Sequence, residues 1–399
     1  MLNDIKFNRG RGGLGRALAG KDHISGIIIG MALAKIPAAV VAAPNAVIYS
    51  VQDADDLDIV YSTAASNLEV DALRYAIETV YQQNKKAVIH LNVFDNTGTT
   101  PPTLASKLID LQNGASGEIR QALILAPATP FTVASLAPLQ AACDTLEAEH
   151  KPISVIYAPD FTGLDIASFD LRALDNKNVS VAAGMDGNGK GNALATAYLK
   201  TFSCAGAVLG VLSKAKVNEN IAWVGAFNVN KNDVNEFDVL KLASGEPFSG
   251  VSKSELDAIN TKGFIFLLKH VGKAGSYFND AHTASIVSGD FAYIENVRTV
   301  DKAVRESRIF LLDKLNAPLY VNDNGTLTED SIAEFKNEGE KALEEMQKNG
   351  EISTFSVTID PDQNILTSSK IAITISIVPA GVARNIVVNI GLAVRVANV

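Results

Sequence analysis

The feature that most constrains this chain is a long alternating apolar segment near its C-terminal end. Residues 383–396 read ARNIVVNIGLAVRV, and an extended chain would place large aliphatic side chains on one face. These are Ile386, Val388, Ile390, Leu392, Val394 and Val396. Such a strand needs a sheet, because unpaired backbone groups beside an apolar face readily pair with another chain. The segment therefore either closes the sheet of its own domain or is donated to a neighbouring subunit.

Residues 26 to about 230 alternate short apolar runs with amphipathic stretches. Residues 70–83 have apolar side chains at helical spacing, and the strand-like run AVIHLNVF follows them. Further strand-like runs are QALILA, ISVIYA and VSVAAG, and helical stretches lie near 104–112 and 135–149. Alternating strands and helices predict a largely parallel sheet that is covered on both faces. We expect an outer α/β domain over residues 26–260.

The last hundred residues have a different pattern. It predicts helices near 299–316 and 329–349, followed by the alternating runs FSVTI and IAITISIV. We expect an inner α+β domain over residues 261–384, so that the whole chain has an α/β (α+β) fold. Residues 1–25 are rich in glycine and arginine and cannot form a core alone. We expect residues 1–25 and 385–399 to be extended arms, with Leu2, Ile5 and Phe7 as apolar contacts of the first.

Charge and composition exclude several classes of function. The net charge is -9, whereas a protein that binds nucleic acid needs clustered positive charge, so we expect no nucleic-acid partner. The apolar run 27–43 contains Lys35 and Pro37 and is too short to span a bilayer, so we expect no membrane insertion. Cys143 and Cys204 lie among small or apolar residues, which predicts buried, inert thiols.

Two glycine-rich segments invite comparison with nucleotide-binding loops. Gly10, Gly12 and Gly15 match GxGxxG but lack a preceding strand. The segment Gly184–Gly191 is a closer match, because it lies between a strand-like and a helix-like run and contains Lys190. Glycine follows that lysine, however, so the hydroxyl that would bind Mg²⁺ is missing. A nucleotide-binding α/β enzyme that uses this loop is the alternative interpretation; a simple Gly-rich turn is the plainer one.

We expect no catalytic, cofactor or metal site elsewhere in the chain. The five histidines are scattered without metal-ligand spacing, and no GxSxG motif marks a nucleophile. The helix near 299–316 instead predicts a basic face of Arg298, Lys302 and Arg305 opposite an apolar face. This basic face is either solvated or a docking strip for an acidic surface.

Several longer segments carry a family resemblance. In the C-terminal part they are YIENVRTVDKAVRESRIFLLDKLNAP, GEISTFSVTIDPDQNIL and SIVPAGVARNIVVNI, in this order and spacing. Earlier in the chain they are ISGIIIGMALAKIPAAVVAAPNAVIYSVQDADDL and GAVLGVLSKAKVNENIAWVGAFNV. Together they resemble the contractile tail sheath family of phages and related injection systems, in its small-sheath subgroup. The resemblance covers most of the chain.

The resemblance implies a structural subunit that is not an enzyme. It implies an inner C-terminal domain around a tail tube, and terminal arms that add strands to the sheets of adjacent subunits. Sheaths of this family assemble as six-fold rings that stack helically, and they contract to drive the tube through a target envelope. The implied partners are further copies of the chain, the tail tube protein, and baseplate and tail terminator proteins. Arg298, Lys302 and Arg305 are then the candidates that face the tube.

The same resemblance implies a location and leaves one further interpretation open. Subunits of this type assemble in the bacterial cytoplasm and end in a virion tail or an injection particle. No cofactor is implied. A non-contractile capsid or baseplate component is the further interpretation, and it predicts closed rings or shells instead of helical tubes.

Overall fold

The computed structural model describes residues 21–36, 45–62, 67–230, 236–388, 390 and 392, with only the backbone for residues 57–62. The chain divides into two compact units, Met1–Arg308 and Ile309–Val399, and each is described by itself. The expected arm contacts Leu2, Ile5, Phe7, Val394 and Val396 lie outside the described residues.

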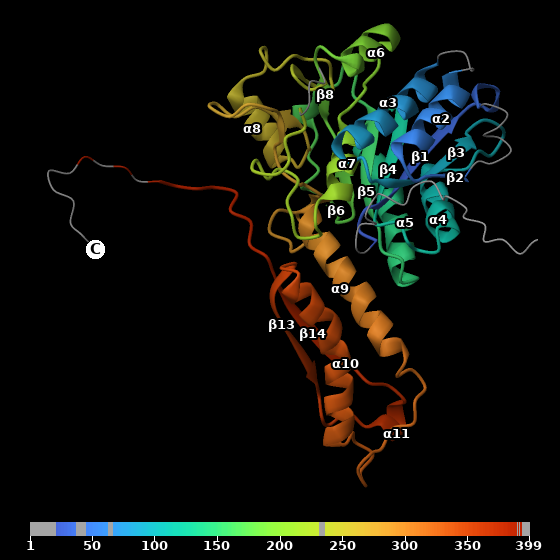
Figure 1. Cartoon of the computed structure of the whole chain (residues 1–399), viewed down its shortest axis with the longest axis vertical. Helices are drawn as coiled ribbons and strands as arrows, with labels where there is room; N and C mark the ends of the chain where they lie inside the picture. Colours follow the sequence, from blue (N-terminus) through green and yellow to red (C-terminus); the bar gives the residue numbers. More distant parts are fainter. Residues whose placement is uncertain are drawn as a thin grey trace, which may run out of the picture. The chain divides into compact units, whose positions relative to one another are not determined.

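A six-stranded sheet forms the centre of the first unit (Figure 1). Its strands, in spatial order, are β2 (Asn45–Ile48), β3 (Val88–Asp95), β1 (Ile24–Met31), β4 (Gln121–Pro130), β5 (Ser154–Asp160) and β7 (Val179–Val181). All neighbours pair in parallel except β2 and β3, which are antiparallel. The predicted, largely parallel sheet is therefore confirmed.

Helices cover both faces of this sheet, because successive side chains of its strands point to opposite sides. Ile27 and Ile29 of β1 pack in one cluster with α3 (Leu68–Gln83) and α7 (Ala205–Lys214). Ile28 packs on the other side with α4 (Leu104–Gly114) and α5 (Leu136–Ala148). Helix α2 (Val51–Ser62) lies beside α3, and Ala54 packs against the first cluster. All three isoleucines are fully buried, as a doubly covered sheet requires.

Most of the remaining elements of the first unit are short; the long helix α9 is the last of them. They are η1 (Leu33–Lys35), η2 (Val133–Ser135), η3 (Ile166–Ser168), β6 (Asp175–Asn176), β8 (Gly184–Asp186), α6 (Lys190–Tyr198), β9 (Leu240–Leu242), α8 (Lys253–Thr261), β10 (Leu267–Leu268), β11 (Tyr277–Phe278), β12 (Ala284–Ser285) and α9 (Ile294–Leu312). Helix α9 begins five residues before its expected start at 299 and continues past the end of the unit at Arg308.

The division between the units differs from the expected boundary at 260/261. Residues 261–308 belong to the first unit. The physical reason is burial: Phe264 and Phe266 lie in the second core cluster, and Ile265 forms a parallel bridge with Ala182, just after β7. This stretch therefore completes the core of the α/β unit, and the later unit is shorter than expected.

The second unit is a small α+β arrangement. It contains α10 (Glu329–Lys348), β13 (Ile352–Ile359), α11 (Ile365–Ser368) and β14 (Ile373–Pro379). The side chain of Thr328 caps α10 by accepting from the backbone N–H of Ser331, at a position typical for Thr. Helix α10 packs on β13 where Gly339 meets Val357, since a Cβ at Gly339 would lie 3.2 Å from a methyl carbon of that valine.

Close packing of α7 on α3 in the first unit depends on two glycines. A Cβ at Gly206 would lie 2.6 Å from the carbonyl oxygen of Ala76, and one at Gly210 would lie 2.7 Å from that of Val80. Both neighbours are backbone atoms of α3, which cannot move away as a flexible side chain could. Only glycine therefore permits this helix–helix distance.

Gly206→Ala should accordingly lower the free energy of unfolding by about 1–3 kcal/mol, the usual effect of overpacking a core. Urea unfolding followed by circular dichroism would measure the change. Gly114→Ala is the matched control, because a Cβ there meets nothing within 4 Å. Equal stability of the Gly206→Ala variant and the unchanged protein would contradict this account of the α3–α7 contact.

Candidate functional site

The C-terminal apolar segment is exposed in the structure. Of its described side chains, Ile386 is 81% exposed, Val388 68%, Ile390 90% and Leu392 107%. No strand is assigned to residues 380–388, so within the described part the segment does not complete a sheet of its own chain. A row of large aliphatic side chains in water is typical of surfaces that bind another protein or a membrane.

The second unit contains a sheet that is suited to accept an added strand. β13 and β14 pair in antiparallel fashion, with Phe355 opposite Ile377 and Val357 opposite Ile375. Among the described residues neither strand has a second neighbour, so each has an outer edge that another strand could join. A two-stranded sheet is marginally stable by itself. Additional strands would therefore stabilise this unit.

The expected exposed basic face of α9 is wrong. Arg298 is 3% exposed, and its guanidinium donates to the carbonyl oxygens of Leu212 at 3.0 Å and Ala215 at 3.3 Å, at the end of α7. Lys302 pairs with Asp22 at 3.0 Å, and its side chain is only 16% exposed. The basic face packs into the first unit, and this burial counts against contact of Arg298 and Lys302 with a tube.

The third basic residue, Arg305, is half-buried, and its charge acts on Asp22 together with those of Arg298 and Lys302. Asp301 lies one turn before it and is 9% exposed. Burial raises the pKa of the Asp301 carboxyl to about 6, even though Arg305 acts to lower it. Val304, on the expected apolar face, is 49% exposed. The amphipathic pattern of this helix does not by itself reveal which face turns inward.

In the glycine-rich loop, carboxylates of the protein bind the backbone N–H groups that would hold a nucleotide phosphate. Asp186 at the end of β8 is fully buried, and its carboxylate accepts the backbone N–H groups of Gly189 at 2.6 Å, Asn192 at 3.1 Å and Phe237 at 2.8 Å. In a phosphate-binding loop, such N–H groups at a helix N-terminus point at the ligand. They are already engaged here.

A second carboxylate, Glu236, engages the remaining donors of this loop. It accepts from the backbone N–H groups of Lys190 and Gly191 and from the hydroxyl of Tyr75, the last at 3.0 Å. Burial and the neighbouring Asp186 raise the pKa of Glu236, as expected for two carboxyl groups that share one site. The loop is a structural turn, and the structure does not support the alternative of a nucleotide site there.

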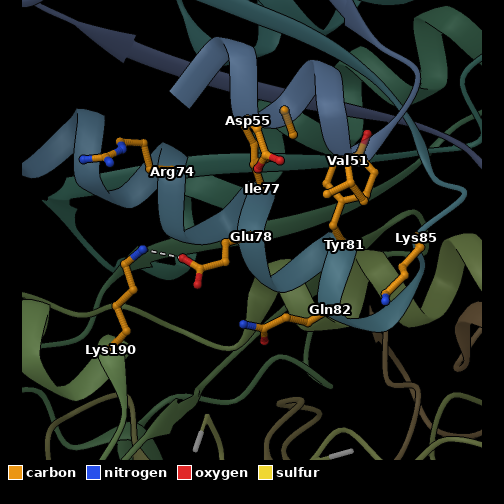
Figure 2. A pocket seen from close by; sticks show the side chains of 10 residues that line it. Val51, Asp55, Arg74, Ile77, Glu78, Tyr81, Gln82, Lys85 and Lys190 are labelled. Atoms are coloured by element: carbon orange, nitrogen blue, oxygen red, sulfur yellow. Dashed lines mark hydrogen bonds and ion pairs between the residues drawn. The ribbon is translucent and has the colours of Figure 1, made fainter. Parts of the chain in front are cut away.

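A pocket of about 450 Å³ lies beside α3, and its side chains are drawn in Figure 2. Its lining residues are Val51, Ala54, Asp55, Arg74, Ile77, Glu78, Tyr81, Gln82, Lys85 and Lys190. Figure 2 shows Lys190, at the start of α6, reaching Glu78 on α3 to form an ion pair. The lining contains no histidine or cysteine.

Three further findings concern the described residues only. They contain no group of three or more His, Cys, Asp or Glu side chains that could hold a metal ion. Among the helices built from them, none is both long and apolar enough to cross a membrane. Cys143 and Cys204 are free and buried, as their surroundings in the sequence predict.

The raised pKa of Asp301 predicts a pH dependence of stability. The folded state holds this proton more tightly than the unfolded state, so protonation stabilises the fold and that contribution is lost as pH rises through about 6. From pH 7 to pH 4.5, the unfolding free energy of the protein should therefore rise relative to that of Asp301→Asn. Urea titrations across this range would measure the difference, with Asp110→Asn on the surface of α4 as the control. A difference that does not change with pH would contradict the assignment.

Comparisons with known proteins agree with the expected fold. Chains in two cryo-EM structures each have a TM-score of 0.62 with this chain. The first, from the anti-feeding prophage baseplate, is 14% identical, and the match covers 98% of this chain and 99% of that chain. The second, from the PVC sheath complex of an extracellular contractile injection system in its contracted state, is 11% identical, with 99% and 98% covered.

A third similar structure is the sheath tail protein from Desulfitobacterium hafniense. It has a TM-score of 0.51 and 13% identity, over 94% of this chain and 100% of that chain. At these identities the likeness establishes the fold alone.

A search of curated proteins found no significant match. Family comparison matches residues 2–282 to the N-terminal domain of DUF2586 and residues 290–397 to its C-terminal domain. The chain belongs to the DUF2586 family.

Proposed function

We propose that the chain is a structural subunit of a contractile sheath, which polymerises around a tail tube and is not an enzyme. The likeness to chains of two contractile assemblies supports this, because it extends over nearly the full length of all three chains. Exposure of the C-terminal apolar segment beside a sheet with two open edges is the observation that carries the proposal. In this proposal, the segment of one subunit adds a strand to β13 or β14 of another.

The energies involved explain why such a contact must be repeated. Burial of the four described aliphatic side chains is worth roughly 6–12 kcal/mol. Ordering the backbone of residues 386–392 costs roughly 7–14 kcal/mol. Each new ladder hydrogen bond contributes about 0.5–1.5 kcal/mol net. One arm alone is therefore close to balance, and firm assembly depends on several linked contacts per subunit, which multivalency supplies.

The remaining partners follow from the same proposal. The N-terminal arm, with Leu2, Ile5 and Phe7, would form a second link between subunits. Six-fold rings would stack helically around the tail tube protein and end at baseplate and tail terminator proteins. Contraction would draw its work from the difference between two packings of the same subunits. Assembly would take place in the bacterial cytoplasm, before the subunits become part of a virion tail or an injection particle.

Deletion of residues 385–399 tests the proposal. The described side chains of this segment are exposed, so the truncated protein should keep the circular dichroism spectrum and the melting temperature of the full-length monomer. It should nevertheless form no tubes in negative-stain electron micrographs. A full-length variant in which residues 386–396 are shuffled should also fail, because it keeps the composition but loses the alternation. Tubes of normal length from either variant would refute the donated strand.

A further inference from the structure

The first described residues of the first unit lie against its last helix. Lys21 and Asp22 come just before β1, and α9 runs past Arg308, the last residue of this unit. Asp22 and Lys302 lie 280 positions apart in the sequence, yet their side chains pair at 3.0 Å. This ion pair therefore joins the start of β1 to α9, and the strands of the central sheet lie between the two residues in the sequence.

The residues at the Asp22 end of this ion pair are held by contacts with the sheet. Strand β1 follows at once and pairs in parallel with β3 and with β4. Lys21 forms an ion pair with Glu118, and the side-chain amide of Gln121 donates to the carbonyl oxygen of Asp22 at 3.0 Å. These contacts fix the carboxylate of Asp22 in front of α9.

The Lys302 end of the ion pair, on α9, is also held by several contacts. The carboxylate side chain of Asp22 is 24% exposed and the ammonium side chain of Lys302 is 16% exposed, so water screens the pair less than a surface pair. Burial acts to raise the pKa of Asp22, but Lys302, Arg298 and Arg305 lower it below its usual range. The pair is therefore ionised at neutral pH. One turn earlier, Arg298 fastens α9 to the carbonyl end of α7.

We propose that the Asp22–Lys302 ion pair is a tension-bearing tether that passes load from the N-terminal arm directly into α9. Two points that are tied together share an applied force through the tie, so the pair relieves the 280 positions between them of part of the load. The tether would let the arm pull on α9, with less load on the α/β sheet than the β1 ladder alone would pass to it. This inference rests on the proposed function, in which a neighbouring subunit holds the arm.

A force measurement on single full-length chains tests the tether. One handle is attached at the N-terminus and the other at Arg308→Cys, an exposed position, since both native cysteines are buried. At constant force, Asp22→Asn should shorten the time before the first opening about tenfold, because it removes the carboxylate charge that offsets Lys302, Arg298 and Arg305. Lys302→Met should act in the same direction, and Lys302→Arg should keep most of the lifetime.

Asp110→Asn is the matched control, because it removes a carboxylate that pairs with Lys107 at 2.8 Å within α4 and leaves the Asp22–Lys302 pair unchanged. It should leave the lifetime unchanged. Equal lifetimes for Asp22→Asn and the unchanged chain would overturn the tether, provided that circular dichroism shows both to be folded. If Asp22→Asn does not fold, the comparison of Lys302→Met with Lys302→Arg decides instead. Because single chains are pulled, this result is independent of whether the protein forms tubes.

Discussion

An apolar segment in water and a sheet with open edges together set the main constraint on this molecule. Ile386 and Ile390 are almost fully exposed, while β13 and β14 are each other's only strand neighbours among the described residues. Neither feature is stable alone, because the first leaves aliphatic surface in water and the second leaves backbone groups without ladder partners. Pairing between copies removes both problems at once. The α/β unit, in contrast, satisfies its own core.

The parallel sheet could be predicted from the sequence because its strands are buried on both faces. A doubly covered strand reads as a short continuous apolar run, as in Gly26–Gly30 and Gln121–Ala126, and the short length of these runs favours a strand over a helix. The boundary near 260 could not be predicted. Phe264 and Phe266 complete a core whose other members lie far away in sequence, and such tertiary contacts leave no local periodicity.

The candidate site was predictable only in part, for a physical reason. Alternation predicts a strand, whereas no strand is assigned to residues 380–388 within the single chain, and the side chains of Val388 and Leu392 are exposed. The amphipathic pattern of α9 predicts that its basic face is exposed, and this prediction is wrong. Arg298 is buried and Lys302 is partly buried, because backbone carbonyl groups and the carboxylate of Asp22 bind their charged groups. Likewise, the Gly184–Gly191 loop has the glycines of a phosphate site, but Asp186 occupies its N–H donors. Sequence spacing cannot reveal such internal partners.

The central claim is that copies of this chain are joined by a donated strand, and a cryo-EM reconstruction of the assembled protein tests it most directly. The account predicts helical tubes in which residues 386–392 form a ladder with β13 or β14 of a different copy. A reconstruction in which this segment folds back onto its own chain would contradict the account. So would a protein that forms only closed shells or remains a monomer at high concentration.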